Sequence, residues 1–257
     1  MAEYTKIIND QGTVLIDDSY QNHHLIGTRK HQVKEFTQSA RFGGGGYYVY
    51  EKSFTVSSVS QPVVAYRALN DDIIALETVY EETSPNNWTV RMYIHMIQFR
   101  YLPNNWIVAY IYGLLPTGTE PSKGVVFQVF DANKKIVFDS GRFPMYVEGY
   151  YSSFGHADWY QKQSGYVPNS FPDMEWSIPN YDVNKVYAVV PTQHIFRAFY
   201  SNPNVFYYYL SYPWRIDNKF KFNITQIGAG SLVGWTNTDL SLNSEAFVLI
   251  NVTGINV

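Results

Sequence analysis

One pattern occurs twice in the chain and constrains its fold more than any other feature. Residues 7–18 read IINDQGTVLIDD and residues 129–140 read VFDANKKIVFDS, which align without gaps at an offset of 122 residues. In each copy two apolar residues precede a polar turn, and three apolar residues and an Asp follow it. This arrangement is typical of a β-hairpin. We therefore expect hairpins over residues 5–18 and 125–140 in a chain organised as two halves, with chance similarity of two unrelated hairpins as the alternative.

Composition indicates a mostly β protein. Aromatic residues make up 18% of the chain, and Tyr is the commonest of them with 23 copies. Tyr, Phe, Val, Ile and Thr favour strands, whereas the helix formers Ala, Leu, Glu and Lys are scarce here. We expect an all-β fold of antiparallel, sandwich-like sheets with long aromatic-rich loops, and a helix content below roughly a fifth of the residues, against the usual ~30–35%.

Local patterns suggest how the strands are ordered. Residues 89–101 alternate, with Val90, Met92 and Ile94 on one face and polar or aromatic residues on the other, which predicts a long strand. The tetrapeptide Pro-Asn-Asn-Trp precedes this strand at residues 85–88 and returns at 103–106, and its Pro and Asn preset turns. Residues 116–123 form the best linker candidate. They predict an N-terminal β domain over 1–120 and a C-terminal β domain with aromatic-rich loops over 124–257, with a loop inside a single domain as the open alternative.

Several classes of function lack their sequence signals. The formal net charge is −3 with no basic cluster, so nothing indicates nucleic-acid binding. There is no cysteine, which excludes disulfides, thiol catalysis and cysteine-ligated zinc. No apolar run approaches the ~18–20 residues of a membrane helix, and we expect no secretory signal because the first residues lack an apolar segment. The six His residues show no HExxH spacing and no G-x-S-x-G elbow occurs, so we expect neither an enzyme nor a cofactor or metal.

Candidate binding residues concentrate between residues 143 and 214, which hold nearly half of all the aromatic residues. Tyr and Trp combine a rigid apolar body with a polar tip, which suits subunit interfaces, and sugar rings stack well on them beside acids. The candidate interface or glycan-binding residues are Asp158, Trp159, Asp173, Trp176, Tyr207, Tyr208, Tyr209, Tyr212 and Trp214. His156 and Glu175 lie in the same region, so the stretch from Ser152 to Trp176 is where an unforeseen acid pair or metal site would gather. The ordinary alternative is that these residues pack on their neighbours in loops and in the core.

Residues 124–140, GVVFQVFDANKKIVFDS, followed by Pro144, resemble a signature of small structural proteins of tailed bacteriophages. Those proteins carry a hairpin of the form G-apolar-x-V-aromatic-N/D-A-x-G-x-apolar-x-F-D-S. Here Lys134 replaces the usual turn glycine, whereas the N-terminal copy keeps a glycine at Gly12 and the Asp at Asp17 but lacks the final Ser. The resemblance covers these 17 residues strongly and the general layout weakly, and it brings no catalytic motif with it.

The resemblance implies a non-enzymatic virion protein, a tail, tail-tip or fibre component that is assembled in the host cytoplasm. Its expected partners are further copies of itself and other tail proteins, without nucleic acid or membrane insertion. A carbohydrate-binding, receptor-recognising module is one alternative, with a host surface glycan or receptor as its ligand. A polysaccharide depolymerase that uses Asp158, Asp173 or Glu175 is the other.

Overall fold

The structure is a computed structural model of the whole chain. It describes residues 6–8, 14–17, 22–44, 47–69, 75–97, 104–116, 118–124, 126–154, 174–177, 182–193, 196–202, 205–216, 219–230 and 244–257. In these residues the chain is nearly all β, with antiparallel pairing throughout and two short 3-10 turns, which confirms the predicted fold class.

A six-stranded sheet forms the centre of the molecule, and its order is β12-β18-β14-β6-β9-β3. Three of its strands come from the first half of the chain: β3 (His24–Gln32), β6 (Val63–Ala68) and β9 (Trp106–Gly113). The other three come from the second half: β12 (Tyr146–Phe154), β14 (Tyr187–Gln193) and β18 (Ser244–Asn251). The two sets meet at the middle of the sheet, where Tyr66 of β6 pairs with Val189 of β14. The sheet thus takes strands from both sides of the division proposed at residues 120–124, and that division stays a prediction.

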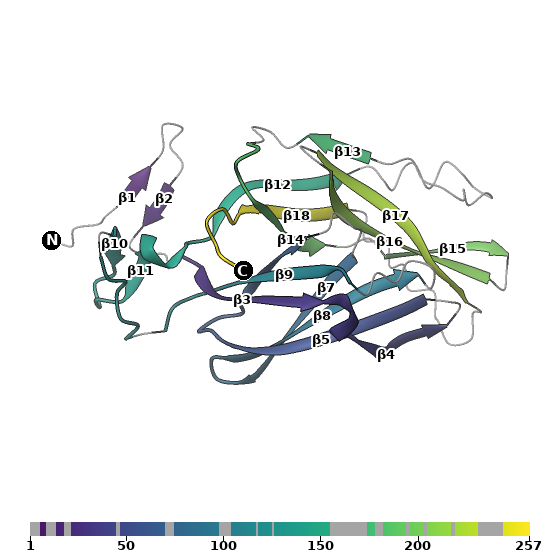
Figure 1. Cartoon of the computed structure of the whole chain (residues 1–257), viewed down its shortest axis with the longest axis horizontal. Coiled ribbons are helices and arrows are strands. Elements are labelled where there is room, and N and C mark those ends of the chain that lie inside the picture. Colours follow the sequence, from purple (N-terminus) through teal and green to yellow (C-terminus); the bar gives the residue numbers. More distant parts are fainter. Residues whose placement is uncertain are drawn as a thin grey trace.

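Two four-stranded sheets and two hairpins complete the fold (Figure 1). The first sheet contains β4 (Thr37–Gly44), β5 (Tyr47–Ser57), β8 (Asn87–Ile97) and β7 (Ala75–Ser84) in that order, and the 3-10 turn η1 (Val33–Glu35) leads into it. The second contains β13 (Met174–Ser177), β17 (Lys219–Gly230), β16 (Val205–Ile216) and β15 (Phe196–Asn202). The hairpins are β1 (Lys6–Ile8) with β2 (Val14–Asp17), and β10 (Gln128–Phe130) with β11 (Ile136–Asp139), which the 3-10 turn η2 (Ser140–Arg142) follows.

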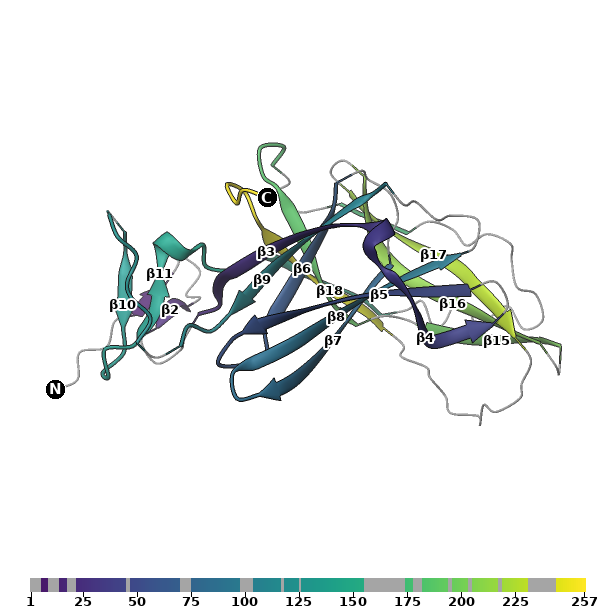
Figure 2. The same cartoon turned by 60° about the horizontal axis from the view of Figure 1, so that its bottom comes forward.

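Both predicted hairpins are confirmed, and they share one pairing register. Ile7 pairs with Ile16, and Val129 pairs with Phe138, 122 residues further along. The other two pairs of each hairpin correspond at the same offset, and so does the irregularity after the second pair. Figure 1 and Figure 2 place the two hairpins next to each other at one end of the molecule. The sequence repeat is therefore also a repeat of backbone geometry.

The repeat continues into the central sheet. The strand that follows each hairpin lies at an edge of that sheet: among the strands that the structure describes, β9 is the neighbour of β3 and β18 is the neighbour of β12. At its start β3 is also bridged to the chain just before β12, where His24 pairs with Pro144. In β3 the register shifts between Leu25 and Gly27, and in β12 it shifts between Val147 and Gly149. These positions again correspond at the offset of 122. The strand order is consequently equivalent when counted from either edge: β3, β9 and β6 correspond to β12, β18 and β14, and β6 and β14 pair antiparallel at the centre.

Apolar side chains fill both faces of the central sheet. On one face, Val64, Ile107 and Ile111 of the central sheet pack against Val90 and Met92 of β8, which makes the first half a β-sandwich. The predicted alternation of β8 is confirmed for Val90, Met92 and Ile94, which are fully buried. A second cluster on the central sheet joins the halves, because it combines residues of β6 and β9 with residues of β14, of β18 and of the position after β18: Ala65, Val108, Tyr110, Tyr112, Ala188, Val190, Ile250 and Val252.

Candidate functional site

The turn of the β10–β11 hairpin shows how the phage-like pattern determines its own backbone. The Asp131 side chain accepts hydrogen bonds from the backbone N–H groups of Asn133 (2.9 Å) and Lys135 (2.8 Å). Lys134 has φ = 62°, in the left-handed region that glycine adopts without strain. This is the position at which the resembled pattern carries glycine, so the pattern's glycine has a geometric reason and Lys134 adopts the same conformation at some cost.

Asp139, the Asp before the final Ser of the pattern, is fully buried and accepts three hydrogen bonds. Its Oδ2 accepts from the backbone N–H of Ser122 (2.9 Å) and from Nε2 of Gln128 (3.2 Å), and its Oδ1 accepts from the N–H of Gly141 (2.9 Å). The Arg142 guanidinium adds a positive charge, with Nε 3.5 Å from Oδ2. Burial alone would raise the pKa of Asp139, but the hydrogen bonds from Ser122, Gly141 and Gln128 outweigh it and lower the pKa. Asp139 therefore stays ionised and holds the chain entering the hairpin to the chain leaving it.

His24 connects the Asp139 site to the first half of the chain. It is fully buried at the start of β3, and its Nε2 accepts a hydrogen bond from the backbone N–H of Asp139 (2.9 Å). Because a backbone N–H can only donate, Nε2 is unprotonated and the neutral ring carries its proton on Nδ1. Burial lowers the pKa of His24, against smaller raising effects of the Asn22 backbone and of Asp139. Nε2 of His24 is thus occupied by the hydrogen bond from Asp139, and Nδ1 is buried.

Backbone hydrogen bonds join the same two segments on both sides of His24. The N–H of Asn22 donates to the carbonyl of Val137, and the N–H of Leu25 donates to the carbonyl of Phe143 (2.9 and 3.0 Å). The N–H of Met145 donates to the carbonyl of His23 (2.9 Å). Residues 22–25 and 137–145 thus form one unit, called here the hairpin junction, which fixes the second hairpin to β3.

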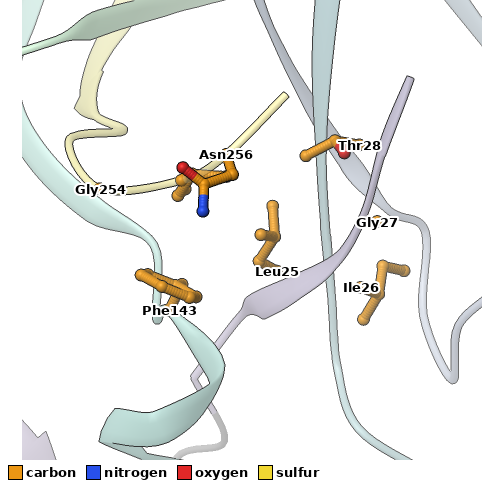
Figure 3. Close-up of a pocket in the computed structure, with 8 residues that line it drawn as sticks. Leu25, Ile26, Gly27, Thr28, Phe143, Gly254 and Asn256 are labelled. Carbon is orange, nitrogen blue, oxygen red and sulfur yellow. The ribbon is translucent and has the colours of Figure 1, made fainter. Parts of the chain in front are cut away.

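An open hollow of about 380 Å³ lies beside the hairpin junction (Figure 3). Its walls come from the irregular start of β3, from Phe143 and from the C-terminal tail: Leu25, Ile26, Gly27, Thr28, Phe143, Gly254, Ile255 and Asn256. None of these residues is charged. The lining is apolar apart from the side chains of Thr28 and Asn256, which can form hydrogen bonds.

Exposed apolar side chains gather where the second hairpin runs into β12. Of the exposed large hydrophobic residues among those the structure describes, six lie between residues 127 and 150, with exposed fractions from 42% to 64%. They are Phe127, Phe130, Phe143, Tyr146, Val147 and Tyr150. They lie on three parts of the fold: Phe127 and Phe130 on the second hairpin, Phe143 in the wall of the hollow, and Tyr146, Val147 and Tyr150 on β12.

The residues singled out in the sequence divide into two groups. Asp158, Trp159, Asp173 and the nearby His156 lie outside the described residues. The others belong to the second four-stranded sheet, where the strand positions are described but the side chains are not: Glu175, Trp176, Tyr207, Tyr208, Tyr209, Tyr212 and Trp214. The register of this sheet places Trp176 opposite Phe220, and Lys221 opposite both Glu175 and Trp214. Whether these residues bind anything stays a prediction.

Sequence reasoning missed His24 and the structural role of Asp139. The Asp was part of the resembled pattern, and that was the signal available. Nothing in the sequence marked His24, because its partner lies 115 residues away. Tyr146 and Tyr150 fall inside the aromatic stretch 143–214, but their exposure follows from the edge position of β12, which the sequence did not reveal.

No group of three His, Cys, Asp or Glu side chains that could hold a metal ion occurs in the described part of the chain. No helix among the described residues is long and apolar enough to cross a membrane. No known protein family, curated protein or solved structure matches the chain.

Proposed function

We propose that this chain is a non-enzymatic structural protein of a tailed-bacteriophage particle, a component of the tail, tail tip or fibre. The observation that carries the proposal is the hairpin over residues 124–140. Its sequence resembles the phage pattern, and the characteristic positions of that pattern have defined roles in its geometry. Lys134 adopts the glycine conformation of the turn, Asp139 ties the hairpin ends together, and the Ser140 hydroxyl accepts a hydrogen bond from the N–H of Phe127 (2.9 Å).

The arrangement of the hairpin supports a role in assembly. The hairpin junction holds the second hairpin against β3, so the hairpin is a fixed projection at one end of the molecule. Phe130 of β10 and Phe127, the residue before β10, are exposed on this hairpin. A rigid projection with exposed aromatic rings is suited to binding a neighbouring protein, because no conformational entropy is lost in ordering it.

The experiment is to locate the chain in purified particles of the phage that encodes it. Mass spectrometry of density-purified particles should detect the chain in stoichiometric amount, and a cryo-EM map of the particle should contain its six-stranded sheet in the tail. Particles assembled with the Asp139→Ala variant should incorporate less of the chain, whereas the exposed-turn variant Asp131→Ala serves as the control. Absence of the chain from purified, infectious particles would refute the proposal.

A carbohydrate-binding module is the second candidate, and the sheet β13-β17-β16-β15 favours it. Register brings Trp214 and Glu175 to Lys221 from the two neighbouring strands. A Trp with acidic and basic neighbours is a common composition for a sugar site. A glycan array tests this candidate, with binding lost in Trp214→Ala. Polysaccharide turnover that disappears in Asp158→Asn or Asp173→Asn would instead establish the depolymerase alternative.

A further inference from the structure

The second hairpin is a unit with its own internal structure. Among the strands that the structure describes, β10 and β11 pair only with each other. Their apolar side chains Val129, Val137 and Phe138 form a cluster of their own, separate from the two clusters of the central sheet. Asp139 closes the base of the hairpin from within, because its three hydrogen-bond donors all belong to residues 122–141. The hairpin can therefore move away from β3 without losing its own pairing.

One bond across the hairpin junction depends on a titratable side chain. The bonds that Asn22, Leu25 and Met145 donate across the junction join backbone to backbone, and none of their partners titrates. The bond from the N–H of Asp139 to Nε2 of His24 (2.9 Å) instead requires a ring nitrogen without a proton. Protonation turns Nε2 into a second donor, so two N–H groups then face each other at hydrogen-bond distance. This bond is consequently lost when the ring becomes an imidazolium.

The surroundings of His24 do not compensate for a charged ring. The charged and titratable groups that face it are Asp139, Arg142 and His23. The Asp139 carboxylate already accepts three hydrogen bonds and lies beside the Arg142 guanidinium. Burial is the largest effect on the pKa of His24 and lowers it; the Asn22 backbone and Asp139 raise it by less, and Arg142 and His23 lower it further. A proton on His24 therefore favours an open site over the closed one.

The hairpin is held less firmly than β3, so the hairpin is the part that moves. His24 begins β3 opposite Gly113, and the pairing with β9 continues to Gln32. Tyr110 and Ile111 of β9 are fully buried and belong to the two apolar clusters of the central sheet. Neither of these clusters includes a residue of β10 or β11. Opening the junction at the hairpin thus leaves the packing of the central sheet in place.

We propose that His24 is an acid-sensitive latch for the second hairpin. When the pH falls below neutrality, the imidazolium displaces the N–H of Asp139, and β10, β11 and η2 detach from β3 as a folded unit while the central sheet stays paired. The exposed rings of Phe127 and Phe130 move with the hairpin, so acid changes how the chain presents them. The latch goes beyond the proposed function, because it is a property of the chain itself and does not depend on a phage particle.

Hydrogen exchange followed by mass spectrometry of the full chain tests the latch. The His24→Gln variant is the comparison, because Gln can accept the bond from Asp139 but does not titrate. Measuring both proteins at the same pH cancels the pH dependence of the intrinsic exchange rate. The open state gains up to about tenfold in population for each pH unit below about 6.5, the ordinary pKa of His. Peptides within residues 128–142 should therefore exchange about tenfold faster in the wild type than in His24→Gln at about pH 5, and equally fast at about pH 7.5.

Two controls separate the latch from other effects of acid. Peptides within β9 should keep their protection in both proteins, which distinguishes local release from unfolding of the central sheet. The His23→Gln variant should keep the wild-type response, because the side chain of His23 does not bond to Asp139. Hairpin peptides that exchange equally in the wild type and in His24→Gln at every pH, or β9 peptides that lose protection together with the hairpin, would overturn the proposal.

A measurement on the wild type alone covers the case in which His24→Gln does not fold. NMR titration should show the His24 ring and the backbone amide of Asp139 changing with one shared midpoint between about pH 7.5 and pH 5. A ring that stays neutral over this whole range, or one that gains its proton while the Asp139 amide signal is unchanged, would refute the latch. These solution measurements need no particle, so failure of the latch and failure of the phage assignment are distinguishable.

Discussion

Replacing Asp139 with Ala should destabilise the hairpin junction strongly, and the size of the effect follows from the contacts. The carboxylate is itself fully buried, and it accepts from the backbone N–H groups of Ser122 and Gly141 and from the Gln128 amide. Ala leaves these donors without their acceptor. It also removes the counter-charge of Arg142.

Hydrogen bonds to a charged group contribute about 1.5–3 kcal/mol each. Ser122 is only partly buried and Gly141 is exposed, so water can replace part of what their N–H groups lose, and the lower end of this range applies. The two backbone donors alone therefore predict a loss of about 3 kcal/mol in the free energy of unfolding. In a chain of this size that corresponds to a fall in Tm of about 6–12 °C. If the hairpin opens on its own instead, the loss is confined to local stability.

Urea unfolding gives the global value, and hydrogen exchange followed by mass spectrometry gives the local value for peptides within residues 120–145. The control is Asp131→Ala, because Asp131 also accepts two backbone N–H bonds but lies in the exposed turn of the hairpin, where water can replace it. Its expected cost is about 1 kcal/mol. Equal effects of the two substitutions on both measurements would refute the argument that burial gives Asp139 its importance.

Three further outcomes follow from the same region. Burial lowers the pKa of His24 in the folded chain, so below about pH 6.5 the unfolded chain binds more protons than the folded chain. The free energy of unfolding should therefore be highest above this pH and should fall as the pH drops below it. His24→Gln should reduce this slope in urea titrations without abolishing it, since burial also lowers the pKa of His23; an unchanged slope would contradict the assignment. Gly141→Ala should lower Tm and reduce the free energy of unfolding by about 1–3 kcal/mol, because the added Cβ would lie 2.7 Å from the Ser122 side chain. Gly27→Ala is the control and should be tolerated, because its added Cβ would have no contact under 3.9 Å. Lys134→Gly should raise stability by up to about 1 kcal/mol in thermal unfolding, because glycine adopts a φ of 62° without strain; a loss of stability would show that the Lys134 side chain makes a contact of its own.

Much of the fold could be predicted because strands leave periodic signals. The alternation of Val90, Met92 and Ile94 predicted β8, and all three side chains are buried as expected. Tyr93, predicted on the opposite face, is buried as well, because both sides of this strand are covered there. Periodicity indicates which residues share a face, but it does not tell how many faces the rest of the chain will cover.

The candidate site was less predictable because it depends on contacts between distant segments. His24 and Asp139 are 115 residues apart, and only the folded sheet brings them to 2.9 Å. The exposure of Tyr146 and Tyr150 depends on β12 being an edge strand, and strand order is not written in local sequence. The count of aromatic residues could indicate a region of interest, but not which of its rings face solvent.

The duplicated arrangement also explains why the sequence repeat is visible in the hairpins and faint elsewhere. A strand inside a sheet needs only side chains of suitable polarity on each face, so two equivalent strands can diverge while their pairing stays the same. The two copies also share a glycine after the register irregularity, at Gly27 and Gly149. Exposed side chains on an edge strand are free of this requirement for polarity, because they face solvent. The two edge strands show this freedom, because the exposed residues are Arg29 and Lys30 on β3 and Tyr146 and Tyr150 on β12.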